Sequence, residues 1–259
     1  MKTILERNKD AWNKQVDKKN QWTLPVSSEV IAKARQGEWS VVLTPEKPVP
    51  KEWFPSMQGL KILALASGGG QQAPIFAAAG AEVTVFDLSP NQLSQDRLVA
   101  DRDNLKLRTV EGDMSDLSCF SNDSFDLIFH PCSNCFVPDV KPVWKEAFRV
   151  LKAGGTLISG FTNPVTLILD PEKEKQGIVE LKHKLPYSDL TSITEEERVR
   201  LYGQDEPITF GHTLQDQIGG QIAAGFHLIG FYEDGWKSAG GINNLMDCFI
   251  ATRALKPKS

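Results

Sequence analysis

Two polar features near one another in the chain could hold a ligand. The run ASGGG at residues 66–70 follows a short apolar stretch, and Asp87 stands at the end of the next one. Glycines let the backbone bend sharply and approach a ligand closely. An acid about 20 residues after such a loop commonly accepts hydrogen bonds from both ribose hydroxyls. The pair predicts a site for an adenosine derivative. A tight loop, with a simple turn at Asp87 and Ser89, is the alternative.

Alternating strands and helices must position this site. We expect strands at residues 61–66, 82–87, 105–110, 125–130, 156–161, 226–234 and 244–255. Helices are expected at 71–80, 89–103, 140–155 and 213–225, where amphipathic patterns end in glycine or begin with a Ser-Pro cap. Strands and helices that alternate through short connections imply an α/β fold, with a parallel sheet covered by helices on both faces.

The amino-acid composition changes along the chain and divides it into four segments. Residues 1–58 hold four of the six tryptophans and a proline-rich stretch, which predicts a wrapping cap with short helices, one of them starting at Ser27. Residues 59–163 form the cofactor-binding core. Residues 164–211 are charged and irregular, with a capping box at Thr194–Glu197, and are expected to form a lid or substrate-facing insertion. Residues 212–259 complete the core sheet.

Composition limits the choice of partners. The chain has 259 residues, of which 41% are hydrophobic and 24% charged, and a net charge of −4. It lacks the concentrated basic face that nucleic-acid binding requires. It also has no apolar run long enough to span a bilayer and no secretory signal. Four scattered cysteines do not make a disulfide framework, so we expect a cytoplasmic protein. The oligomeric state stays open.

Several motifs resemble one known family. The segment ILALASGGGQQAPIFAAAGAEVTVFDLSPNQL resembles the first two motifs of class I S-adenosylmethionine-dependent methyltransferases, in particular the methyltransferase type 11 group similar to enzymes of ubiquinone and menaquinone biosynthesis. VEGDMSDLSCFSNDSFDLIFHP resembles the third and fourth motifs, and AFRVLKAGGTLISGF the fifth. The resemblance implies a Rossmann-like, mostly parallel seven-stranded sheet whose last strand is antiparallel, with S-adenosylmethionine as the cofactor.

The resemblance also implies roles for individual residues. Gly68 and Gly70 make room for the methionine portion and the ribose, and Asp87 holds the ribose hydroxyls. Asp113 accepts the adenine amino group, and Met114 packs on the ring. A helix cap at Asp113 and plain core packing at Met114 are the alternatives. The implied cofactor residues are Ala66, Ser67, Gly68, Gly70, Gln71, Asp87, Leu88, Gly112, Asp113, Met114 and His130.

The sequence departs from the family pattern at two positions. The family usually has an acid where this chain has Ala64, and a glycine where it has Ala66. In the family that acid helps to orient the methionyl amino group. Another group must supply the contact here, such as a carbonyl near His130 or Ser67.

The acceptor side is less well defined. His130 ends a strand at the edge of the sheet where ligands bind, so it is expected to act as a catalytic residue or, alternatively, to serve as a structural group. Asn134 and His212 are expected to contact the substrate. Cys132 and Cys135 have redox or zinc spacing, but no further ligands complete a site, so no metal is expected. Enzymes that methylate exocyclic amines carry an Asn/Asp-Pro-Pro-aromatic element here, which HPCS at 130–133 does not match.

These observations predict a methyltransferase acting on an unidentified small molecule. A hydroxyl acceptor needs a base, whereas an anionic acceptor or a neutral amine needs little acid–base help. The tryptophans of the first segment, and Trp236, either cover the substrate or pack on the sheet. One alternative, suggested by Ala64, is an inactive S-adenosylmethionine-binding protein. The other is an NAD or nucleotide-sugar Rossmann enzyme, which does not account for the Gly112-Asp113-Met114 segment or the reversed last strand.

Overall fold

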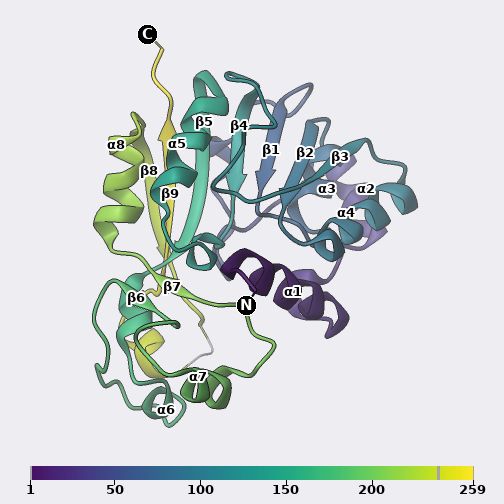
Figure 1. The fold of residues 1–259 in the computed structure, drawn as a ribbon. Coiled ribbons are helices and arrows are strands. Elements are labelled where there is room, and N and C mark those ends of the chain that lie inside the picture. The colour runs from purple at the N-terminus through teal and green to yellow at the C-terminus, as the bar shows by residue number, and fades with distance from the viewer. Residues whose placement is uncertain (1, 238–239, 259) are drawn as a thin grey trace.

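A seven-stranded sheet forms the centre of the computed structural model, which describes residues 2–237 and 240–258 (Figure 1). Its strands are β1 (Lys61–Leu65), β2 (Glu82–Asp87), β3 (Leu107–Glu111), β4 (Phe125–His130), β5 (Leu151–Thr162), β8 (His227–Asp234) and β9 (Phe249–Leu255). They lie in the order β3-β2-β1-β4-β5-β9-β8. Strand β9 runs antiparallel to both of its neighbours, while β1 to β5 pair in parallel. The predicted Rossmann-like sheet with a reversed last strand is confirmed.

Both faces of the sheet are buried, as the continuous apolar strands require. In β1, Ile62 and Ala64 belong to a core on one face, while Leu63 and Leu65 belong to a core on the other. The first core lies under helices α2 (Ser28–Arg35), α3 (Gln72–Ala78) and α4 (Pro90–Asp103). The second lies under α5 (Lys141–Val150), beside which α8 (Gly220–Ala223) packs. Ala64 is therefore a core residue, fully buried on the α3 side.

The first segment contains a helix that the sequence analysis missed. Helix α1 (Ile4–Asp17) has 14 residues and lies across the carboxyl ends of the central strands (Figure 1). Its sequence is polar overall, and its buried residues are Asn8, Ala11 and Gln15, so no run of large apolar residues marks the helix. A capping box between Thr3 and Glu6 begins the helix and was the available signal. The short helices η1 (Gln21–Thr23) and η2 (Lys51–Trp53) follow, and α2 begins after the cap Ser27 as expected.

The predicted insertion at residues 164–211 packs against helix α1. It contains η4 (Pro164–Ile168), α6 (Pro171–Glu174), α7 (Glu195–Tyr202) and a small ribbon of β6 (Tyr187–Ser188) and β7 (Phe210–Gly211). Arg7 pairs with Glu195, and Lys14 pairs with Asp205. Asn8 is 1% exposed and exchanges hydrogen bonds with the backbone of Ile208. The insertion therefore supports α1 from the side away from the sheet.

Some predicted boundaries were wrong. The helix expected at 140–155 ends at Val150, because LKAGG at 151–155 continues directly into a long β5. The last strand begins at Phe249 rather than at 244, since Asn244 ends η6 (Gly241–Asn244) and residues 245–248 form a turn and a short connection. The helix expected at 213–225 is a π-helical turn, η5 (Gln215–Gly219), followed by α8.

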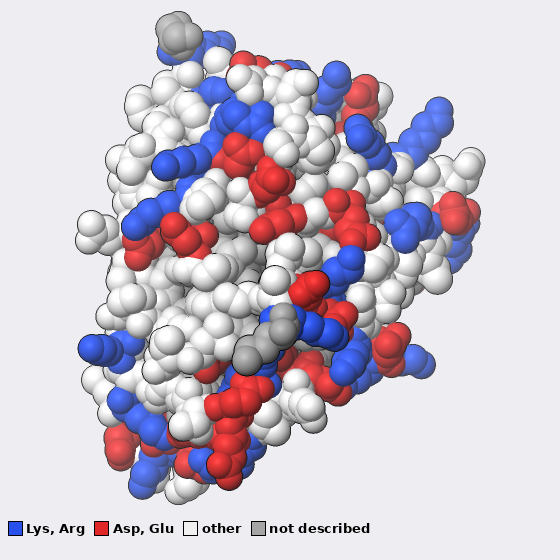
Figure 2. Space-filling view, viewed as in Figure 1, with Lys and Arg blue, Asp and Glu red and all other residues white. Residues whose placement is uncertain are grey.

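The surface mixes charges of both signs. On the face shown in Figure 2, basic and acidic residues lie next to one another around a broad uncharged area. Within the part of the chain that the structure describes, no helix is long and apolar enough to cross a membrane.

Candidate functional site

A cavity of about 320 Å³ opens at the carboxyl ends of β1, β2 and β4. The sheet order reverses between β1 and β4, and ligands of open α/β sheets bind at such a switch point. The loop at 66–70 forms one wall. Its backbone needs the left-handed region, with φ of +47° at Ala66, +115° at Gly69 and +71° at Gly70. The glycines supply this conformation without strain, whereas Ala66 adopts it at a cost.

Asp87 lies where β2 meets this wall. Its carboxylate accepts hydrogen bonds from the backbone N–H groups of Gly68 and Ser89, both at 2.9 Å. Burial raises the pKa of Asp87, although these hydrogen bonds oppose the rise. The turn expected as an alternative to a ligand contact is present, since Ser89 caps α4. Each carboxylate oxygen keeps a further lone pair, and Asp87 lines the cavity, so both functions are compatible.

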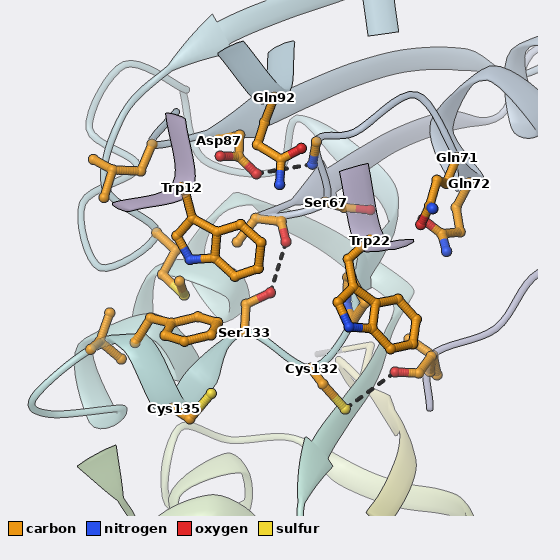
Figure 3. A pocket seen from close by; sticks show the side chains of 18 of the residues that line it. Trp12, Trp22, Ser67, Gln71, Gln72, Asp87, Gln92, Cys132, Ser133 and Cys135 are labelled. Carbon is orange, nitrogen blue, oxygen red and sulfur yellow. Dashed lines mark hydrogen bonds between the residues drawn. The ribbon is translucent and has the colours of Figure 1, made fainter. Parts of the chain in front are cut away.

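Two buried polar atoms on the cavity wall have no hydrogen-bond partner among the described residues. They are the hydroxyl of Ser67, which is 3% exposed, and the side-chain carbonyl of Gln92, which is 5% exposed. Both residues line the cavity, and Figure 3 shows Gln92 beside Asp87. Because unpaired buried polar groups are costly, these atoms favour a polar ligand in this half of the cavity.

The segment after β3 supplies the next part of the wall. Asp113 accepts hydrogen bonds from the backbone N–H and the hydroxyl of Ser115, so it stabilises a turn rather than the expected helix. Met114 is 9% exposed and belongs to the core, yet it also lines the cavity. Gly112 is required by packing, because a Cβ there would overlap the ring of Phe86 at 2.2 Å.

Most of the predicted cofactor residues share this cavity. Those that line it are Ala66, Ser67, Gly68, Gln71, Asp87, Leu88, Gly112, Asp113 and Met114. Gly70 does not line it. Its backbone carbonyl accepts a hydrogen bond from Val26, and a Cβ there would lie 2.8 Å from the carbonyl oxygen of Gln95. Gly70 therefore packs the loop against α4 and the first segment.

The residues predicted for catalysis and substrate contact lie behind the cavity wall. His130, Asn134 and His212 are buried, and none is among the described residues that line the cavity. The ring nitrogens of His130 lie 2.8 Å from the Leu65 carbonyl and 2.6 Å from the Asn134 side chain. His212 contacts the Asn134 carbonyl at 3.0 Å. Burial lowers the pKa of both histidines. In this geometry the three residues form a buried, hydrogen-bonded cluster beside the cavity, and their catalytic and substrate-contacting roles stay predictions.

Residues far apart in the chain line the part of the cavity that lies away from Asp87, called here the opposite wall. Trp12 of α1 and Trp22 of η1 face each other across the cavity, with Cys132 and Cys135 at the end away from Asp87 (Figure 3). Trp236 also lines the cavity. In contrast, Trp39 and Trp53 pack on the core. Trp12, Trp22 and Trp236 are therefore placed where they could cover a ligand, whereas Trp39 and Trp53 follow the packing alternative. No residue of the 164–211 insertion is among the described lining residues, so the insertion does not face this cavity.

The two cysteines on this wall are neutral thiols. Burial raises the pKa of Cys135 to about 12 and raises that of Cys132 further. Cys132 donates a hydrogen bond to the Leu43 carbonyl. Within residues 2–237 and 240–258, no three side chains of the metal-binding types come together in one group.

An acid that the sequence analysis missed supports the loop from below. Asp96 of α4 is fully buried, and its Oδ2 accepts a hydrogen bond from the Gly69 N–H at 3.0 Å. Asp96 stands on the apolar side of its helix with Leu93, Val99 and Ala100. A carboxylate on the apolar side of a helix indicates a buried polar contact, and this pattern could have identified Asp96 from the sequence. The residue lies beneath the same loop whose strand lacks an acid at Ala64.

A parallel sheet with one reversed strand, and a nucleotide-sized cavity at its switch point, define a Rossmann-like class of protein that binds a nucleotide-containing cofactor. A family model described as a methyltransferase domain matches residues 63–159. Over 256 residues, the chain is 50% identical to the uncharacterized methyltransferase YbaJ of Bacillus subtilis (strain 168), covering 99% of this chain and 100% of the relative.

Solved structures share the fold. The S-adenosylmethionine-dependent methyltransferase of Mesorhizobium loti has a TM-score of 0.59 at 19% identity, covering 79% of this chain and 94% of that chain. The one from Methanosarcina mazei has a TM-score of 0.56 at 19% identity, covering 80% and 96%. The chain belongs to the class I S-adenosylmethionine-dependent methyltransferases, and S-adenosylmethionine is its cofactor.

Proposed function

We propose that the cavity holds S-adenosylmethionine against the loop at 66–70 and a small methyl acceptor against the tryptophan-lined wall. One observation carries this proposal. Asp87, Ser67 and Gln92 present buried polar atoms on one side of a single cavity, and aromatic side chains form the other side. The polar half suits a ribose and a methionyl group, while the aromatic half suits a separate organic molecule.

Each cofactor residue has a distinct part in this proposal. Asp87 accepts the ribose hydroxyls, and the absence of a side chain at Gly68 leaves room for them. Asp113 and Met114 hold the adenine. The free hydroxyl of Ser67 and the free carbonyl of Gln92 are donor and acceptor for the methionyl end, and so replace the contact that an acid at Ala64 would give. Gln92 was not among the residues predicted from the sequence.

The protein's contribution to the reaction is alignment and exclusion of water. S-adenosylmethionine supplies a methyl group activated by a sulfonium. The loop at 66–70 fixes the donor, and the wall of α1 and η1 fixes the acceptor, so that the two meet in line in a dry cavity. His130 acts as a positioning residue, because it ties the end of β4 to β1 and to Asn134.

The insertion at 164–211 serves as a brace in this proposal. It contributes no described lining residue, but it grips α1 through the Arg7–Glu195 pair and the buried Asn8. Helix α1 carries Leu5 and Trp12, which line the cavity. The part of the chain that covers the acceptor is therefore α1, and the insertion holds it in place.

Ligand-dependent stability tests the proposal. S-adenosylmethionine and S-adenosylhomocysteine should raise the melting temperature, and NAD should not, because only a ligand of the folded state stabilises it. Asp87→Ala should weaken cofactor binding by about 1.5–3 kcal/mol in titration calorimetry, the range for a hydrogen bond to a charged group. Asp123→Asn is the matched control, since Asp123 pairs with Lys256 on the surface. Equal affinity in Asp87→Ala and Asp123→Asn would contradict the assignment.

A further inference from the structure

The wall opposite Asp87 is mainly aromatic and carries no charged side chain among the described lining residues. Trp12 packs edge-on against Phe136 with ring centroids 5.2 Å apart, and Trp22 lies 6.0 Å from Trp236. Phe249 continues the second pair, with its ring centroid 6.3 Å from that of Trp236. All five rings line the cavity, and Figure 3 shows Trp12 and Trp22 on its two sides. An acceptor placed here lies between aromatic surfaces.

Three of the polar side chains on this wall, those of Asn8, Cys132 and Ser133, are already paired within the protein. Asn8 donates to the carbonyls of Phe136 and Ile208 and accepts from the Ile208 N–H. The hydroxyl of Ser133 donates to the Ala66 carbonyl at 2.8 Å, and Cys132 donates to that of Leu43. A polar acceptor group that faces Asn8, Cys132 or Ser133 would therefore displace these bonds or stay unpaired, which is costly in a buried site.

Charge is also absent from this wall. Among the described residues that line the cavity there is no lysine, arginine or histidine, and the carboxylates are those of Asp87 and Asp113 on the cofactor side. A carboxylate or phosphate on the acceptor would lose its hydration without gaining a cation. The wall also offers no group that could remove a proton near neutral pH, because burial raises the pKa of both cysteines far above that range.

We propose that the acceptor is an uncharged, mainly apolar molecule that is methylated at a lone-pair atom carrying no proton near neutral pH, such as a weakly basic heteroaromatic nitrogen. This inference rests on the proposed function. The acceptor's lone pair forms the new bond to the methyl carbon, the carbon–sulfur bond breaks, and its electrons stay on sulfur. The positive charge passes to the acceptor atom, where the faces of Trp12 and Trp22 stabilise it. No proton has to leave, so no base is needed.

Three aromatic probes of similar shape test the inference. They are quinoline, quinoline-6-carboxylate and 2-naphthol, which represent a neutral lone pair, an added charge and a hydroxyl that needs a base. Binding is followed by quenching of tryptophan fluorescence with S-adenosylhomocysteine present, so it does not depend on turnover. Quinoline should bind more than about tenfold more tightly than its carboxylate, because the carboxylate would be buried unpaired. With S-adenosylmethionine, quinoline should be methylated and 2-naphthol should not at neutral pH.

A substitution on this wall should reverse the preference between quinoline and its carboxylate. Val42 lines the cavity and is partly exposed, so Val42→Lys should place a cation on this wall without breaking the core. It should weaken quinoline binding and improve binding of the carboxylate, each by about tenfold. Leu98→Lys is the control, since Leu98 is 51% exposed on α4 and lies outside the cavity lining.

The possible results distinguish a failure of this acceptor inference from a failure of the proposed cofactor site. If S-adenosylhomocysteine stabilises the protein but quinoline fails to quench, or the carboxylate binds as tightly, the acceptor class proposed here is wrong. Methylation of 2-naphthol at neutral pH would also overturn it, because that reaction requires a base. If S-adenosylhomocysteine itself does not bind, the proposed cofactor site is wrong instead.

Discussion

Asp96 Oδ2 accepts a hydrogen bond from the backbone N–H of Gly69 at 3.0 Å, although Asp96 is fully buried in α4. Its other carboxylate oxygen has no partner in the described part of the chain. Burial raises the pKa of Asp96 to about 8, and the carboxylate of Asp87 adds to the rise. The acid therefore carries a proton at neutral pH and supports the loop as a neutral group.

The first prediction concerns the pH dependence of stability. The pKa of Asp96 is higher in the folded state than in the unfolded state, so its contribution is complete below about pH 4 and is lost as pH rises towards 8. Asp96→Asn keeps the acceptor for Gly69 and removes the titration. Between pH 6 and 8, the wild type should lose about 1 kcal/mol per pH unit relative to Asp96→Asn in urea denaturation. Asp101→Asn, at an exposed site of the same helix, should follow the wild type. Parallel curves for Asp96→Asn and the wild type would contradict this.

The second prediction concerns the strained loop residue. Ala66 has φ +47°, a conformation that costs an L-residue about 1–2 kcal/mol and glycine almost nothing. Because glycine gains entropy in the unfolded state, Ala66→Gly should raise the free energy of unfolding by only about 0.5–1 kcal/mol. Ala32→Gly, at an exposed position inside helix α2, should lower it by about 1 kcal/mol. The change in the free energy of unfolding should thus have opposite signs in the two variants. Equal losses in both would show that Ala66 is unstrained.

The third prediction separates the two contacts that hold α1. Asn8→Ala leaves the buried N–H and carbonyl of Ile208 unpaired, so it should destabilise the protein by about 2–4 kcal/mol and increase hydrogen exchange throughout α1. Arg7→Ala removes a half-exposed pair with Glu195 and should cost about 0–1 kcal/mol. A larger effect at Arg7 than at Asn8 would mean that surface charge, and not the buried amide, fixes this helix.

The fourth prediction concerns His130. Burial lowers its pKa in the folded state, so the unfolded state takes up a proton first as the solution becomes acidic. The contribution of His130 to the free energy of unfolding should be fully present above about pH 6.5 and should be lost as the pH decreases below it. In His130→Gln this loss between pH 7 and 5.5 should be smaller, while the exposed His227→Gln should keep the wild-type dependence. If the two variants lose stability alike on acidification, then His130 does not contribute.

The sheet could be predicted because its strands are nearly continuous apolar runs bounded by glycine and proline. Ile62 to Leu65 are buried on both faces, and such a strand leaves the same pattern wherever its neighbours lie. Failures occurred where local signals conflicted. Leu151 to Gly155 resemble a helix end with a glycine stop, yet pairing with β4 and β9 draws Leu151 and the segment from Thr156 into β5.

The cofactor half of the cavity was more predictable than the acceptor half. Asp87 ends one strand of the parallel sheet, and Gly68 and Asp113 follow two others, so one edge brings them together. The other wall comes from α1, from residues 42–45 and from the segment after β8, whose positions depend on tertiary packing. His130 ends β4 as predicted, yet it does not line the cavity, for a related reason. A residue at the end of a strand can point into either face, and this one points towards Asn134 and Trp144.

Helix α1 has a practical consequence for handling the protein. It begins at Ile4, and Leu5 already lines the cavity, so residues added ahead of Thr3 would start within about two turns of Trp12. The other terminus leaves the reversed strand β9 at the end of the sheet opposite helix α1 (Figure 1). A purification tag or surface tether is best attached there. Fusions at the two ends should then differ in acceptor affinity even though their purity and folding match.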